Sequence, residues 1–134
     1  MIRALVAYVA AAVVFAGLDA VWLTLTNATL YRPTLGPLLT DRPRLVPAVL
    51  FYAIYLAGVV FFAVTPALRA GRWTTAMGLG AALGVFAYAT YDLTNQATLK
   101  VWATHITVLD LPWGAFVTAA GATAGYFAVR LARV

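Results

Sequence analysis

The feature that most limits what this chain can fold into is the stretch from Leu45 to Leu68, which contains no charged side chain. A membrane-spanning helix needs about 20 mostly apolar residues, because each residue adds about 1.5 Å toward a hydrocarbon layer of about 30 Å. Three further apolar stretches approach or exceed that length: Ala4 to Thr26, interrupted only by Asp19, then Trp73 to Tyr91 and Leu111 to Val129. The chain is therefore expected to cross a membrane four times.

Composition supports a membrane protein and excludes several chemistries. The chain is 64% hydrophobic and only 10% charged, whereas about a quarter of the residues of a soluble domain are charged. No stretch alternates with the period of two that barrel strands require. Cysteine and serine are absent, which excludes disulfides, thiolate metal sites and both common nucleophiles. We expect one all-α membrane domain over residues 1–134, a four-transmembrane-helix bundle with helices near 4–27, 45–68, 73–94 and 110–130.

The connections and basic residues suggest an orientation. Residues 27–44 contain three prolines and no apolar period, so they are expected to form a loop, and residues 94–109 a second one. Basic residues next to apolar runs favour contact with anionic lipid head groups over nucleic acid. The two sides carry five and four of them, which by the positive-inside rule places both termini on the cytoplasmic side of a bacterial inner membrane. The larger group is Arg3, Arg69, Arg72, Arg130 and Arg133, and the smaller is Arg32, Arg42, Arg44 and Lys100.

Scarce polar side chains gather between Tyr88 and Gly114, a stretch that holds the only Lys and the only His. Four alternating spans would place Asp19 late in the first helix, Asp92 at the end of the third and Asp110 at the start of the fourth. All three carboxylates are therefore expected near the same face of the bilayer.

Asp92 and Asp19 are the candidate catalytic residues. A carboxylate at mid-membrane depth costs at least about 2.5 kcal/mol, so such acids are usually paired or functional. Asp92 shares a helix face with Tyr88 and Asn95, at i−4 and i+3, and could exchange a proton or anchor a substrate. Alternatively, Asp92 ends its helix and pairs with Lys100. Asp19 could act in the same way or could form a hydrogen bond between helices.

The candidate binding residues each have a simpler structural alternative. Asp110 precedes Leu-Pro-Trp-Gly, a pattern typical of a helix N-cap, although a capping Asp can also face a cavity. Lys100 could neutralise an acid or hold an anionic head group, and His105 could shuttle a proton. Trp22 and Trp113 could line a cavity or belong to an interfacial aromatic belt. Tyr88 and Asn95 complete this set, and neither a metal nor a cofactor is predicted.

The motif YDLTNQATLKVW, followed by DLPWG, resembles the DUF2177 family of bacterial integral membrane proteins. The resemblance extends to Asp19 with Trp22, to YRPTLG in the first connection and to PAVLFYAIYLAGVVFFAVTPAL in the second apolar run. It implies a four-helix membrane protein. The family has no assigned activity, so the resemblance implies neither a substrate nor catalytic residues.

Three classes of function remain open, and enzymatic activity is undecided. In the first, an acidic, aromatic-lined pocket binds a membrane lipid or an amphiphilic small molecule, which Asp92 and Asp19 could modify by acid–base chemistry. In the second, the chain is a small proton-coupled exporter with a membrane-embedded Asp, working as a homodimer. In the third, it is a structural or accessory subunit of a membrane complex. Glycines four residues apart, at 80 and 84 and at 121 and 125, predict close helix packing in each case.

Overall fold

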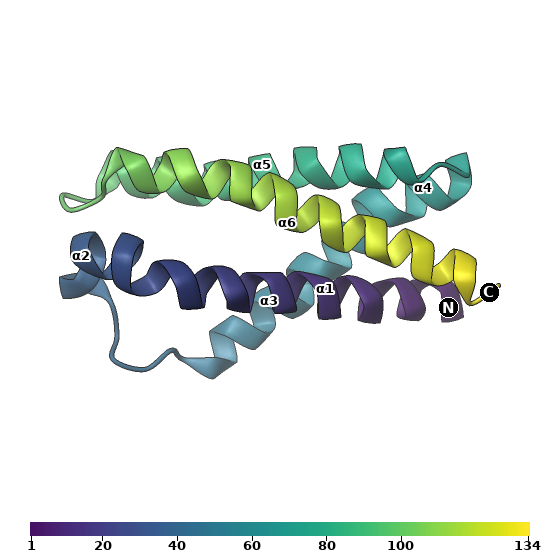
Figure 1. Ribbon diagram of the computed structural model, residues 1–134, viewed down its shortest axis with the longest axis horizontal. Coiled ribbons are helices and arrows are strands. Elements are labelled where there is room, and N and C mark those ends of the chain that lie inside the picture. The colour runs from purple at the N-terminus through teal and green to yellow at the C-terminus, as the bar shows by residue number, and fades with distance from the viewer.

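A computed structural model describes residues 1–134, and all of its regular secondary structure is helical, without a strand. The chain runs forward and back along one long axis, and the N- and C-termini lie at the same end of it (Figure 1). The all-helical prediction is confirmed. The helices are α1 (Ile2–Thr26), α2 (Arg32–Leu35), α3 (Leu45–Val59), α4 (Thr65–Ala70), α5 (Trp73–Thr98) and α6 (Thr104–Leu131), with π-helical turns at Asn27–Tyr31 and Val60–Val64 and a 3-10 turn at Gly36–Leu38.

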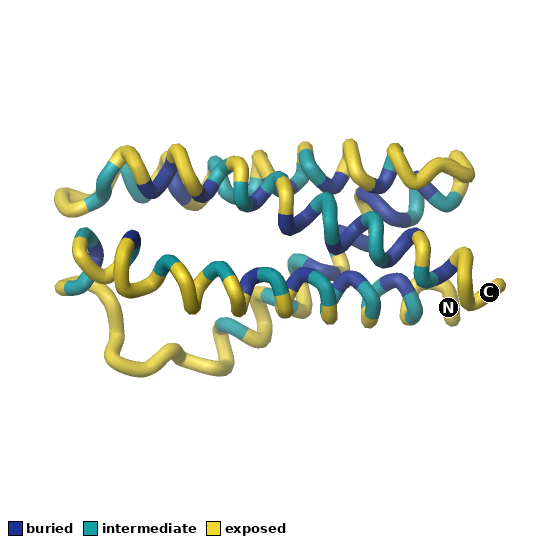
Figure 2. Tube along the Cα trace, viewed as in Figure 1, coloured by how far each residue is buried: buried dark blue, intermediate teal, exposed yellow.

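Three continuous helical stretches are long and apolar enough to cross a membrane: Ile2–Leu38, Leu45–Ala70 and Thr104–Leu131. The second stretch joins α3, a π-helical turn and α4. Its outer surface carries exposed Ile54 and Phe61, and Figure 2 shows exposed residues along the outward faces of the helices. Apolar side chains on the outside suit contact with lipid, which supports the prediction of a membrane protein.

Helix α6 lies between α5 and α1 and packs closely against both. A Cβ added at Gly84 of α5 would overlap the backbone of Gly114 in α6. On another face of α6, a Cβ at Gly125 would lie 3.0 Å from the carbonyl oxygen of Ala7 in α1. Small residues let these helices approach where lipid supplies no hydrophobic drive. The prediction that the glycines allow close packing is confirmed.

The connection after α1 differs from the loop expected over residues 27–44. Helical structure continues to Leu38, and the irregular part is confined to residues 39–44. Pro33 and Pro37 stand in the first turn of the short helical segments that follow. A first-turn residue has no intrahelical partner for its N–H, so proline is tolerated there.

The connection before α6 is also shorter than the expected loop over residues 94–109. Helix α5 continues to Thr98 and α6 begins at Thr104, after the N-cap Ala103. His105 therefore lies in the first turn of a helix. Asp110 lies inside α6 and does not cap it, so the N-cap interpretation is wrong. The sequence pattern misled because Pro112 is accommodated inside the helix, where it removes one hydrogen bond without ending it.

Candidate functional site

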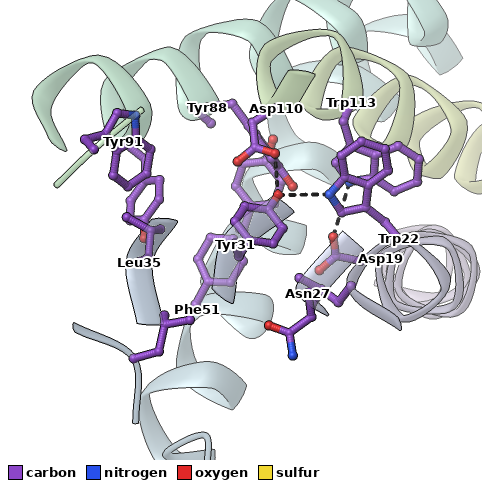
Figure 3. A pocket seen from close by; sticks show the side chains of 15 residues that line it. Asp19, Trp22, Asn27, Tyr31, Leu35, Phe51, Tyr88, Tyr91, Asp110 and Trp113 are labelled. Carbon is purple, nitrogen blue, oxygen red and sulfur yellow. Dashed lines mark hydrogen bonds between the residues drawn. The ribbon is translucent and has the colours of Figure 1, made fainter. Parts of the chain in front are cut away.

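A cavity of about 460 Å³ lies between the helices at the end of the bundle away from the termini. Side chains from α1, α3, α5 and α6 form its walls, together with the π-helical turn Asn27–Tyr31 (Figure 3). Twelve of its fifteen lining residues are hydrophobic. The lining residues are Asp19, Trp22, Leu23, Asn27, Tyr31, Leu35, Leu39, Phe51, Tyr55, Ala87, Tyr88, Tyr91, Trp102, Asp110 and Trp113.

Asp19 connects three helices beside this cavity. Its residue is buried in α1. Its Oδ2 accepts a hydrogen bond from the Tyr52 hydroxyl of α3, and its Oδ1 accepts one at 3.3 Å from Trp113 Nε1 of α6. Both donors are uncharged, so the carboxylate is held in place without a counter-charge. The predicted interhelical hydrogen bond of Asp19 is therefore present, and the residue also lines the cavity.

Asp110 is held in a comparable way from the other side of the cavity. It is buried in α6 and accepts a hydrogen bond from the Tyr31 hydroxyl. The Tyr31 oxygen in turn accepts a hydrogen bond at 3.0 Å from Trp22 Nε1 (Figure 3). The Trp22 and Trp113 rings are stacked, with centroids 4.5 Å apart and planes 8° apart. The stacked indoles thus join the Asp19 and Asp110 hydrogen-bond networks.

The π-helical turn places two cavity residues. The backbone N–H of Arg32 bonds to the carbonyl of Asn27, five residues earlier. This wider turn ends at Tyr31, two residues before Pro33, whose ring disturbs regular α-helical hydrogen bonding to the preceding turn. Single π-helical turns of this kind are frequent at functional sites. Here the turn begins and ends with cavity-lining residues, Asn27 and Tyr31.

Hydrogen bonds between uncharged side chains link α5 and α6 beside the short connection that joins them. Thr107 Oγ1 donates a hydrogen bond to Gln96 Oε1 at 2.8 Å, and Trp102 Nε1 donates one to Thr107 Oγ1 at 3.0 Å. Gln96 Nε2 also donates to Thr104 Oγ1 at 3.0 Å. These bonds hold the short connection in place, and with it the Trp102 indole that lines the cavity.

Five of the predicted site residues lie together at the cavity, and four do not. The five are Asp19, Trp22, Tyr88, Asp110 and Trp113. Asp92, Asn95, Lys100 and His105 are absent from the cavity lining, and the last two are exposed at the surface.

Asp92 is buried in α5 but does not line the cavity. Its side chain has no exposed surface, and neither carboxylate oxygen has a hydrogen-bond partner. The alternative in which Asp92 pairs with Lys100 is therefore wrong for this structure. Its own helix also carries Tyr88 and Tyr91, which line the cavity.

Sequence reasoning missed the tyrosines that hold the acids. Tyr31 and Tyr52 donate to Asp110 and Asp19, and Tyr55 shares a hydrogen bond of 2.8 Å with Thr118 of α6. A usable signal was present, because Tyr52 and Tyr55 lie three residues apart in an otherwise apolar helix and so share one face. Hydroxyl groups at such positions need a partner when they are buried.

The arrangement can bind groups that donate hydrogen bonds or carry positive charge. Two carboxylates line the cavity, and no cluster of three or more His, Cys, Asp or Glu side chains suitable for a metal ion is found. Acid–base chemistry within the cavity would fall to Asp19 and Asp110, because Asp92 does not reach it.

Comparisons with known proteins give a family. No curated protein and no solved structure matches this chain. One family model, DUF2177, described as a predicted membrane protein, matches residues 4–127. That match includes every residue that lines the cavity, from Asp19 to Trp113. The chain belongs to the DUF2177 family of predicted membrane proteins.

Proposed function

We propose that this protein spans the bacterial cytoplasmic membrane four times and binds a lipid-like or amphiphilic small molecule in the cavity beside Asp19 and Asp110. The polar part of the ligand contacts the two carboxylates, and the apolar part extends along the aromatic and aliphatic walls. A cavity that is mostly apolar, with a few convergent polar groups, is the usual form of a small-molecule site.

The observation that carries this proposal is the exposure of the apolar cavity rim. Leu23, Leu39 and Phe51 line the cavity and are 45%, 38% and 49% exposed. Leu23 and Phe51 adjoin further exposed apolar side chains, Leu25 and Leu50. In a bilayer such a rim faces acyl chains, so an amphiphile can enter sideways without leaving the hydrocarbon.

The fourth span is α5. It has 26 residues, enough for about 39 Å at about 1.5 Å per residue. It packs along α6, which is itself a membrane-spanning candidate. With α5 included, the two chain ends, which share one end of the bundle in Figure 1, face the same side of the membrane, and the basic residues favour the cytoplasm.

Cysteine labelling tests the orientation directly, because the chain contains no cysteine. Single variants Arg133→Cys and Thr98→Cys place one thiol after α6 and one at the end of α5. In intact cells a membrane-impermeant maleimide should label Thr98→Cys, and Arg133→Cys should react only after lysis. Equal labelling of both in intact cells would contradict four spans.

Filling the cavity tests ligand binding. Ala87 lines the cavity on α5, and Ala82 is an exposed residue of the same helix. The protein is purified in maltoside detergent and measured by native mass spectrometry. Wild type and Ala82→Phe should retain a bound amphiphile, and Ala87→Phe should lose it. Equal retention by both variants would place the bound molecule elsewhere on the surface and refute the proposal.

A further inference from the structure

We infer that the ligand of this cavity is a cationic amphiphile, with a single amine or ammonium group on an apolar body. This inference rests on the proposed function and narrows it to one chemical class. It comes from the charges, the hydrogen-bond donors and the aromatic walls of the cavity.

The cavity carries two carboxyl groups and no basic side chain to pair with them. Asp19 and Asp110 both line it, and no Lys, Arg or His is among its lining residues. Arg32 follows the lining residue Tyr31, and Lys100 lies in the connection between α5 and α6. Both are exposed and outside the cavity lining. A phosphate, sulfate or carboxylate ligand would bring negative charge next to two acids and no basic group in a low-dielectric setting, which strongly disfavours its binding. A cation supplies the missing charge.

The carboxylates also have unused acceptor capacity. Asp110 accepts one side-chain hydrogen bond, from Tyr31, and Asp19 accepts two, from Tyr52 and Trp113. An ionised carboxylate offers about four lone-pair sites and donates nothing. The ligand is therefore expected to donate hydrogen bonds. An N–H or ammonium group between these two acids would occupy acceptor sites on both of them.

Aromatic rings form the remaining surface around the acids. Trp22 and Trp113 are stacked beside Asp19, and Tyr88 and Phe51 contribute further rings to the lining (Figure 3). The faces of such rings attract cations, and tryptophan does so most strongly. Two carboxylates among rings offer too few oxygen ligands for Ca²⁺, which takes 6–8. The site therefore favours an organic cation over Ca²⁺.

Three probes with the same alkyl chain test the charge preference: dodecylammonium, dodecanol and dodecyl sulfate. Each is titrated below its micelle concentration into the maltoside-purified protein, and the cavity indoles report binding through tryptophan fluorescence. The ammonium probe should bind at least tenfold more tightly than the other two. Ala87→Phe should weaken its binding at least tenfold, and Ala82→Phe should not.

Variants of the two cavity acids test whether the charge preference can fail while ligand binding in the cavity remains. Asp19→Asn with Asp110→Asn should remove the preference, so that the ammonium and alcohol probes bind alike. Asp41→Asn, which changes an exposed loop acid, should keep the preference. Binding of dodecanol or dodecyl sulfate as tightly as the ammonium probe, and still blocked by Ala87→Phe, would overturn the inference and leave the proposed function intact. Failure of Ala87→Phe to affect any probe would overturn both.

The ammonium group of phosphatidylethanolamine shares this chemistry with a free amine, provided that the lipid's phosphate stays outside the cavity, away from the two acids. Nanodiscs made of phosphatidylglycerol alone, or with phosphatidylethanolamine added, distinguish them. Weaker binding of the ammonium probe in the presence of phosphatidylethanolamine, seen in wild type and absent in Ala87→Phe, identifies the lipid amine. Equal affinity in both nanodiscs identifies a free amphiphilic amine.

Discussion

Replacement of Asp92 by leucine should stabilise the protein. Asp92 has no exposed surface, and both of its carboxylate oxygens lack a hydrogen-bond partner. A buried polar group without a partner costs about 1–3 kcal/mol. Leucine has the same number of side-chain heavy atoms as aspartate and the same branching, so Asp92→Leu exchanges the two oxygens for larger methyl groups, which the neighbouring side chains must accommodate. We expect the free energy of unfolding to rise by about 1–3 kcal/mol.

The assay is unfolding by sodium dodecyl sulfate in mixed maltoside micelles, followed by circular dichroism at 222 nm. Asp92→Asn is the matched control, because it keeps a polar side chain without partners and should leave the free energy of unfolding nearly unchanged. A loss of 1 kcal/mol or more in both Asp92→Leu and Asp92→Asn would refute the reasoning, because the nearly isosteric asparagine adds no bulk and a loss in that variant would mean that the carboxyl group has a stabilising partner in the folded protein. A stabilised variant that no longer binds its amphiphile would show that this acid is retained for function, as buried acids in membrane proteins often are.

Two other substitutions test the packing and the site. Gly84→Ala places a Cβ on the Gly114 backbone and should lower the free energy of unfolding by about 1–3 kcal/mol. Gly78 lies on an exposed face of the same helix with open space around it, so Gly78→Ala should be neutral or stabilising by up to about 1 kcal/mol. Tyr52→Phe removes a donor to Asp19 and should cost about 1.5–3 kcal/mol in the same unfolding assay. An unchanged midpoint for Gly84→Ala or Tyr52→Phe would show that the respective contact does not stabilise the folded state.

The helical membrane fold was predictable because hydrocarbon leaves few alternatives. Every backbone N–H and C=O within a bilayer must be bonded inside the protein, so long uncharged stretches can only be helices. The apolar run from Leu45 to Leu68 predicts one helical stretch, and the structure has Leu45–Ala70. The π-helical turn inside that stretch, Val60–Val64, was not predictable, because it arises from local hydrogen-bond geometry that hydropathy does not record.

The site was predictable in part, because alternating spans fix depth but not rotation. Topology predicts that Asp19, Asp92 and Asp110 lie at similar depth, yet only Asp19 and Asp110 line the cavity. Neighbouring residues of a helix point about 100° apart, so Tyr91 faces the cavity while Asp92 is buried beside it. Which of the two side chains reaches the cavity depends on how α5 is rotated against α6, and packing determines that rotation.

The cavity itself follows from where small and large residues lie along α1 and α6. Near the chain termini, Gly125 and Gly121 bring α6 against Ala7 and Ala11 of α1: a Cβ at these glycines would lie 3.0 Å and 3.4 Å from the two carbonyl oxygens. At the other end the stacked rings of Trp22 and Trp113 stand between the same helices, and Figure 1 shows α1 and α6 diverging in that direction. Glycine at one end and tryptophan at the other make the helix pair splay apart. Splayed helices leave unfilled space beside the widest point, which is where Asp19 and Asp110 are found.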